Sequence, residues 1–129
     1  MILKRGWNEK EKDNDWIFCK IARGEIKSNL IYSDDNFFGI LDIHPVAEGH
    51  TLIISKKHFK TILDMPSSLG CELIDAVKKV SLDLIKQKRA EGFNLLVNTN
   101  ESAGQIVHHF HAHVIPLRKG DGVRIGWMD

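Results

Sequence analysis

Three histidines alternate with other residues in His109-Phe110-His111-Ala112-His113, and their spacing is compatible with chemistry on phosphate. Side chains of a β-strand point to alternate faces, so these rings would share one face with neighbours roughly 6.5–7 Å apart. Neutral imidazole can act as nucleophile, base or acid near neutral pH, because its unperturbed pKa is about 6.5. One ring could attack a phosphoryl centre to form a phosphoramidate, while the outer rings bind phosphate oxygens and protonate the leaving group.

On spacing alone, the three histidines are compatible with two alternatives to phosphoryl chemistry. The rings could be hydrogen-bonded or solvent-facing without a function, although three buried imidazoles would need a partner for every ring nitrogen. Alternatively, two histidines at i and i+2 on a strand could ligate a metal, as in a metal-dependent hydrolase. The spacing does not decide between metal binding and phosphoryl chemistry.

The size and charge of the chain limit its partners. With 129 residues it can close one hydrophobic core, so we expect a single domain over residues 1–129. Its 18 Lys and Arg balance 17 Asp and Glu, which gives a formal net charge of +1. A protein that coats long nucleic acid normally carries a basic excess, because phosphate neutralisation supplies most of the affinity. We therefore expect a small-molecule substrate and no long nucleic acid partner.

The cysteine content and the hydropathy pattern favour a cytoplasmic protein. Cys19 and Cys71 are the only cysteines, too few for the disulfide framework of a small secreted domain. No apolar run approaches the roughly 20 residues that span a bilayer. The N-terminal residues are too polar for a signal peptide. We expect a cytoplasmic localisation without membrane contact.

The elements around the histidines are expected to form an α+β domain with a mainly antiparallel sheet. Turn-forming residues at 33–36 predict a hairpin, and apolar residues spaced three and four apart predict one long helix. Along the chain we expect a loose arm at 1–14, a short helix at 16–21 closed by Gly24, hairpin strands at 31–32 and 37–41, a strand at 50–54, the long helix from Pro66 with a stop near Gly92, a strand at 93–97, a polar loop at 98–104, a strand at 106–117 and a tail at 120–129. In the last strand, Phe110, Ala112 and Val114 would face away from the histidines and pack under the long helix.

The segment Gly104-Gln105-Ile106-Val107-His108-His109-Phe110-His111-Ala112-His113-Val114-Ile115-Pro116 resembles the signature of the histidine triad (HIT) family. The resemblance covers about residues 15–120 and includes Ile17-Phe18-Cys19-Lys20-Ile21, Leu41-Asp42-Ile43-His44-Pro45, Gly49-His50-Thr51-Leu52-Ile53-Ile54, Lys56-Lys57-His58 and Val97-Asn98. It implies a five-stranded antiparallel sheet with one long and one short helix, paired into a homodimer. Within the family, residues 116–122 look most like dinucleoside polyphosphate hydrolases and general prokaryotic members.

The resemblance also implies an enzyme that hydrolyses or transfers a nucleotide at its α-phosphate, through a covalent nucleotidyl-histidine intermediate. Its substrate would be a dinucleoside polyphosphate or a nucleoside phosphoramidate. His111 matches the nucleophile, His113 the residue that contacts the phosphate and helps the leaving group, and His109 the support of the nucleophile's ring. His50 matches a fourth histidine near the phosphates. A nucleotide-binding regulatory protein with little turnover is the alternative.

Other positions implied by the resemblance would bind the nucleotide. Asn98 and Gln105 match polar residues around the phosphate, and Asp42 matches a carboxylate that accepts both ribose hydroxyls. The walls of a purine slot are usually apolar. The positions that match this slot are Ile17, Phe18, Ile21, Ile40, Ile43 and Leu52. From residue type alone, Phe18, Ile40, Ile43 and Leu52 could equally well be ordinary residues of the hydrophobic core. His44 and His58 are expected in surface loops.

Two departures from the family pattern bear on the chemistry. Ile106 stands where many relatives carry a polar residue that contacts the leaving group, so the rate or the preferred leaving group should differ. Some members hold a structural zinc with a Cys-x-x-Cys pair in the first helix, but here Trp16 replaces the first cysteine and Cys19 remains. Because a structural zinc needs four protein ligands, we expect no bound metal here. The resemblance also implies an activity that requires no cofactor.

Overall fold

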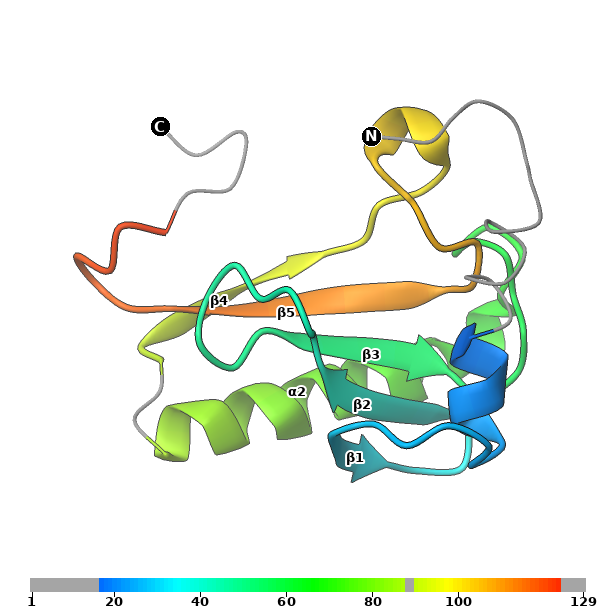
Figure 1. Cartoon of the computed structure of the whole chain (residues 1–129), viewed down its shortest axis with the longest axis horizontal. Helices are drawn as coiled ribbons and strands as arrows, with labels where there is room; N and C mark the ends of the chain where they lie inside the picture. Colours follow the sequence, from blue (N-terminus) through cyan, green and yellow to red (C-terminus); the bar gives the residue numbers. More distant parts are fainter. Residues whose placement is uncertain (1–16, 88–89, 124–129) are drawn as a thin grey trace.

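A five-stranded antiparallel sheet is the largest element of the computed structural model, which describes residues 17–87 and 90–123 (Figure 1). The strand order is β1-β2-β3-β5-β4, and every neighbouring pair is antiparallel. The strands are β1 (Leu30–Ser33), β2 (Phe37–Leu41), β3 (Thr51–Ser55), β4 (Gly92–Leu96) and β5 (His111–Leu117). The predicted fold class is confirmed, and β5 lies between β3 and β4 inside the sheet.

The predicted hairpin is formed by β1 and β2, and Asp34 closes its turn. The Asp34 Oδ1 atom accepts hydrogen bonds from the backbone N–H groups of Asn36 at 2.8 Å and Phe37 at 2.7 Å. Its Oδ2 atom accepts a third bond from the Tyr32 hydroxyl at 2.6 Å. A short carboxylate side chain that bonds the backbone two residues ahead is the usual reason why Asp favours turns.

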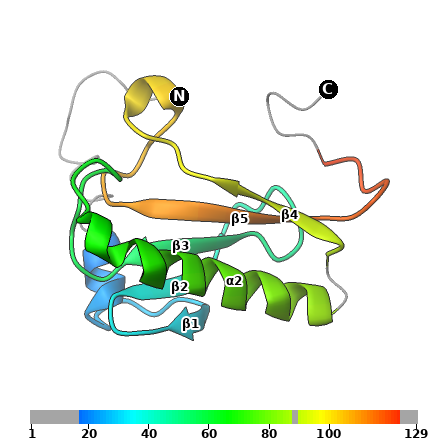
Figure 2. The same cartoon turned by 180° about the vertical axis from the view of Figure 1, so that it is seen from behind.

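The long helix α2 (Gly70–Lys86) covers one face of the sheet, after the short 3-10 turn η1 (Ser67–Leu69) (Figure 2). Its buried apolar face packs on alternate residues of the strands, and this core contains Phe37, Ile53, Ala76, Val77, Val80, Leu84, Phe110, Ala112 and Val114. The predicted position of Phe110, Ala112 and Val114 under the helix is therefore confirmed. The helix ends at Lys86, before the predicted stop near Gly92. By Glu91 the chain has already joined the sheet, since Glu91 N–H donates to Leu117 O at 2.9 Å.

The opposite face of the sheet carries a smaller cluster. Phe38, Ile40, Leu52 and Ile54 are buried there together with Phe18, which comes from a helical stretch at residues 17–22. The side chains of His111 and His113 belong to this face, since they alternate along β5 with the helix-covered Ala112 and Val114. The sheet thus separates the histidines from α2.

The last strand is shorter than predicted, because it begins at His111 and not at Ile106. The preceding residues lie along the loop after β3. Phe110 N–H donates to Phe59 O at 2.6 Å, and Ser55 N–H donates to Phe110 O at 3.3 Å. In addition, the polar loop predicted at 98–104 contains a short 3-10 turn, η2 (Glu101–Ala103). His109 therefore reaches the site from an irregular segment and not by strand alternation.

The predicted loose arm at 1–14 and the last part of the predicted tail, 124–129, lie outside the described residues. The first position of the expected short helix, Trp16, lies outside them as well. Over the described ranges, each helix is too short or too polar to cross a lipid bilayer.

Candidate active site

Four histidine rings and one phenylalanine lie together where β5 begins. The ring centroids of His111 and His113 are 5.2 Å apart, and those of His50 and His113 are also 5.2 Å apart. Phe18 contacts His111 and His109 edge-on, at 5.2 and 5.7 Å. In Figure 1 the blue helical stretch, the green loop after β3 and the start of β5 meet at this end of the sheet. The structure thus gathers all four histidines that the sequence pattern selected.

The protonation of His111 follows from one hydrogen bond. Its Nδ1 atom lies 2.8 Å from the backbone carbonyl oxygen of His109. A carbonyl can only accept, so Nδ1 carries the proton and donates it. In the neutral ring, Nε2 then holds the lone pair. This is the tautomer that a nucleophile attacking through Nε2 requires.

A backbone group also determines the tautomers of His50 and His113. Val46 N–H donates to His50 Nδ1 at 3.2 Å, so the proton of the neutral His50 ring is on Nε2. His50 Nε2 lies 3.0 Å from His113 Nδ1 and donates to it. His113 then carries its own proton on Nε2, as a hydrogen-bond donor. His111 and His113 thus hold complementary tautomers, one with a lone pair and one with a proton on Nε2.

Burial keeps the site histidines neutral. It lowers the pKa of His109 and the pKa of His113 to about 4, and it also lowers the pKa values of His111 and His50. At His113 the neighbouring imidazoles lower the pKa further, because two positive rings in contact would repel each other. Asp42 partly opposes the effect of burial at His50. At neutral pH the rings therefore keep the lone pairs on which the tautomer assignments depend.

Asp42, the predicted ribose ligand, lies beside the outer histidines. Its Oδ1 atom accepts the backbone N–H of His44 at 2.9 Å, and its Oδ2 atom is 3.5 Å from His50 Nε2. Asp42, His50 and His113 lie close enough to hold a cation. A metal bound through His50 Nε2 would require the proton on Nε2 to move to Nδ1. There it would point at the Val46 N–H, which is also a donor. The arrangement therefore favours a hydrogen-bonded chain over a metal site.

Gln105 is an internal clamp of the loop before β5. Its side chain is 3% exposed, its Oε1 atom accepts Asn100 N–H at 2.8 Å, and its Nε2 group donates to Lys60 O at 2.7 Å and Val107 O at 3.1 Å. All of its N–H groups are used, so the predicted contact with phosphate would require one of these bonds to break. Asn98, the other predicted phosphate ligand, is partly buried and lies against Gly104, which has a φ of +95°.

The residues of the predicted purine slot divide into two groups. Phe18, Ile40 and Leu52 are buried in the cluster on the histidine face, and Ile21 packs against it. Ile17 has 36% of its surface exposed, and Ile43 is 84% exposed. Ile106, the departure from the family pattern, is 56% exposed. The structure therefore brings four of the six predicted slot residues together and leaves Ile43 in solvent.

His58 lies in an exposed loop, as the sequence indicated, but its ring contacts His109 at the site. Its Nδ1 atom is 3.0 Å from His109 Nδ1, and Cys19 Sγ lies 3.6 Å from the former and 3.5 Å from the latter. Periodicity could not detect this, because 51 residues separate the two histidines. The resemblance of residues 56–58 to the family pattern was the available clue. Trp16, on which the expectation of no zinc depended, lies outside the described residues.

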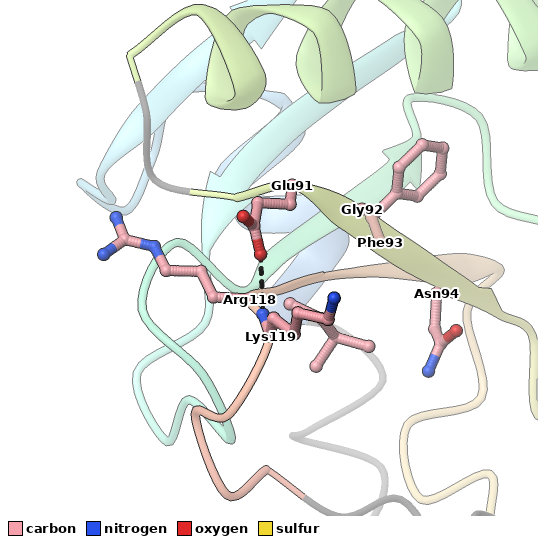
Figure 3. A pocket seen from close by; sticks show the side chains of 7 residues that line it. Glu91, Gly92, Phe93, Asn94, Arg118 and Lys119 are labelled. Carbon is pink, nitrogen blue, oxygen red and sulfur yellow. Dashed lines mark hydrogen bonds between the residues drawn. The ribbon is translucent and has the colours of Figure 1, made fainter.

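A separate hollow of about 590 Å³ lies at the other end of β5 (Figure 3). It is lined by Glu91, Gly92, Phe93, Asn94, Leu117, Arg118 and Lys119. Lys119 N–H donates to Glu91 Oε1 at 2.7 Å and ties the strand ends together. None of the four site histidines lines this hollow, so the chemistry of the site does not extend into it.

Comparison with known proteins gives consistent matches. The model of the HIT domain family matches residues 23–120. An adenylylsulfatase of Arabidopsis thaliana is 41% identical over 108 residues, which are 84% of this chain and 55% of that protein. An adenosine 5'-monophosphoramidase of Candida albicans is 37% identical over 116 residues, 86% and 76% of the two chains. The crystal structure of a zinc-bound histidine triad family protein from Mycobacterium smegmatis superposes with a TM-score of 0.80 at 35% identity, covering 84% of this chain and 79% of that one.

Proposed function

The chain belongs to the histidine triad family, and from this premise we propose that it is a nucleotide hydrolase or transferase that acts at the α-phosphate of its substrate. The substrate would be a dinucleoside polyphosphate or a nucleoside phosphoramidate. Two of the relatives are an adenylylsulfatase and an adenosine 5'-monophosphoramidase, and both names refer to an adenylyl or adenosine monophosphate group. We therefore infer a preference for a purine nucleotide with a variable leaving group.

The observation that carries this proposal is the hydrogen bond from His111 Nδ1 to His109 O. It leaves the His111 lone pair on Nε2, as the attacking atom needs. In the proposed first step, a bond forms between His111 Nε2 and the α-phosphorus while the bond from that phosphorus to the leaving group breaks. The electron pair departs with the leaving group. The product is a covalent nucleotidyl-His111.

His113 supports the same step as a hydrogen-bond donor. Because His50 donates to its Nδ1 atom, His113 keeps a proton on Nε2 for the phosphate or the leaving group. Such a donor stabilises the negative charge that develops on the leaving group. In the second step, water displaces His111 from phosphorus, its proton passes to solvent and the nucleoside monophosphate is released. The chemistry of both steps requires no metal or cofactor.

Nucleotide binding would use the neighbours of the histidines. We propose that Asp42 accepts the ribose hydroxyls and that Asn98 contacts the phosphate. Gln105 would act mainly through its three internal bonds, which hold the loop before β5 in place. The base would lie against the apolar face that includes Phe18, Ile40 and Leu52.

A homodimer is also part of the proposal. Strand β4 is at one edge of the sheet, and its Phe93 and Leu95 side chains are 38% and 46% exposed. An exposed apolar edge strand is a ready surface for pairing with a second chain. Two copies joined at β4 would cover these side chains.

The proposal is tested by incubating the chelator-treated protein with diadenosine and diguanosine polyphosphates, adenosine phosphoramidate and an acyl adenylate, and by measuring the nucleoside monophosphate released. His111→Ala should lower kcat on the order of 10⁴-fold or more while nucleotide affinity changes little, because the nucleophile is removed and the pocket stays. His44→Ala, a change at an exposed loop histidine, is the matched control. Nucleotide binding without turnover of any substrate would instead support the regulatory alternative.

A further inference from the structure

Asn100 has a backbone conformation that is normal only for glycine. Its φ of 71° and ψ of 164° lie in a region that residues with a Cβ atom rarely adopt. Among residues 17–87 and 90–123, it is the only residue other than glycine with a positive φ. Backbone strain of this kind persists only where the surrounding structure holds it, and it occurs preferentially at functional sites. It is therefore a sign that the loop containing Asn100 has a function.

Gln105 holds the strained backbone in place. The Asn100 N–H donates to Gln105 Oε1 at 2.8 Å, and the Asn100 carbonyl oxygen accepts the N–H groups of Ala103 and Gln105, both at 3.1 Å. The Gln105 side chain is itself fixed, because it donates to Lys60 O and Val107 O. The Asn100 side chain makes no capping hydrogen bond at η2. The backbone of Asn100, and not its carboxamide, therefore closes the loop into a ring.

This ring lies beside the nucleophile. In the pairing of β4 with β5, Leu96 is opposite His113, and the same antiparallel register continued by two residues brings Asn98 level with His111. Alternation along the chain puts Leu96 and Asn98 on the face of His113, whereas Val97 packs against the core under α2. In Figure 1 the chain passes from β4 through the yellow turn η2 to the start of β5. Asn98 thus enters the ring from the histidine face of the sheet.

The far end of the ring packs against Asn98. Gly104 has a left-handed φ of +95°, and a Cβ atom added to it would lie 3.7 Å from the Asn98 amide nitrogen. Gly104 N–H donates to Glu101 O at 2.9 Å, so its position depends on the closed ring. We propose that Asn100 is a positioning residue, whose strained backbone closes the ring that holds Asn98 ready to bind the substrate phosphate. This inference rests on the proposed contact between Asn98 and phosphate.

The size of the expected effect follows from preorganisation. A side chain that is fixed before binding loses no rotamer freedom when it contacts the ligand, which increases affinity by about 2- to 10-fold for one side chain. If the ring opens, the Asn98 amide regains this freedom, and the affinity for a phosphate-bearing ligand should fall by a similar factor. A contact of this kind binds substrate and transition state alike, so its loss should raise KM and leave kcat nearly unchanged.

The test is a calorimetric titration of the full-length protein with adenosine monophosphate. Asn100→Val should bind it about 3- to 10-fold more weakly, because a β-branched residue cannot adopt this backbone conformation without further strain. Asn100→Gly keeps the three backbone bonds and relieves the strain, so it should bind within about twofold of the unmodified chain and melt a few degrees higher. Asn29→Val is the matched control, since Asn29 is an exposed loop residue without a positive φ.

Asn98→Ala supplies the readout that a purely structural role of Asn100 would not change. If Asn100 acts through Asn98, Asn100→Val should cause no further loss of affinity in the Asn98→Ala background. In steady-state kinetics, Asn100→Val alone should raise KM by the factor seen in the titration, with kcat changed less than about twofold.

Three results would overturn the inference. They are an unchanged affinity in Asn100→Val, a loss of the same size in the Asn98→Ala background, and an equal loss in Asn29→Val. Circular dichroism of each variant separates a lost contact from a lost fold, and Asn100→Ala replaces Asn100→Val if the latter unfolds. Nucleotide binding without hydrolysis by the unmodified chain would overturn only the proposed function, whereas a chain that binds no nucleotide would overturn both.

Discussion

His50 Nε2 lies 3.0 Å from His113 Nδ1, and the Val46 backbone N–H on the far side of the His50 ring determines which of the two nitrogens donates. This chain of two bonds places a proton on His113 Nε2, whereas the His109 carbonyl leaves a lone pair on Nε2 of the neighbouring His111 ring. Two adjacent rings of identical chemistry are therefore assigned opposite tasks by backbone groups.

Replacing His50 tests whether it acts through His113. In His50→Ala, neutral His113 can place its proton on either nitrogen, so we expect kcat to fall about 10- to 100-fold. The loss should be larger for a substrate with a poor leaving group than for one with a good leaving group, because only the former depends strongly on a donor. Steady-state kinetics with two such substrates measures the difference. Equal losses on both would indicate a purely structural role.

Replacing Gln105 tests the clamp of the loop before β5. Gln105→Ala leaves the N–H of Asn100 and the carbonyl groups of Lys60 and Val107 without their present partner, so the free energy of unfolding should fall by about 2–3 kcal/mol. Gln87→Ala is the matched control, because that exposed side chain bonds only to Asp83 in the described contacts and should cost less than about 0.5 kcal/mol. Urea denaturation measures both values, and similar losses would contradict the clamp.

The stability of the protein should decrease in mild acid. The pKa of His113 is about 4 in the folded chain and about 6.5 when unfolded, so the unfolded state binds the extra proton between these values. Stability is therefore complete above about pH 6.5 and falls towards about pH 4, by up to about 1.4 kcal/mol per pH unit for this group. The lowered pKa of His50 acts in the same direction.

Urea denaturation of the chelator-treated protein at several pH values measures this dependence. His113→Gln should show a shallower fall than the unmodified chain, and His44→Gln an unchanged one. An identical pH dependence in all three proteins would show that His113 does not contribute.

The proposed dimer should depend on one edge of the sheet. Leu95→Lys puts a charge on exposed β4 and should convert the dimer to a monomer in sedimentation equilibrium. Leu30→Lys makes the same change on β1, the other edge strand, where the side chain is 56% exposed, and should leave the dimer intact. A monomer of the unmodified chain, or dissociation by Leu30→Lys instead, would contradict pairing through β4.

Much of the fold could be predicted because it depends on local patterns. The spacing of Val77, Val80 and Leu84 predicts a helix with one buried face, and the structure buries all three. The alternation of Ala112 and Val114 with His111 and His113 correctly predicts which side chains face the long helix. The start of β5 was predicted too early, because the Phe110 N–H donates to Phe59 O in the loop after β3, and periodicity cannot place that loop.

By itself, the sequence determined the family, the sheet and the group of histidines that could act on phosphate, since residue types at short spacing specify a strand face. Only the tertiary structure decided the contacts that give these rings their separate roles. Val46 selects the tautomer of His50, Gln105 joins the loop at Asn100 to Lys60, and His58 meets Cys19 beside His109. The physical reason is that most of these partners are distant along the chain, and even the near ones depend on side-chain orientations that folding sets. The spacing of residues along the chain specifies neither the distant partners nor these side-chain orientations.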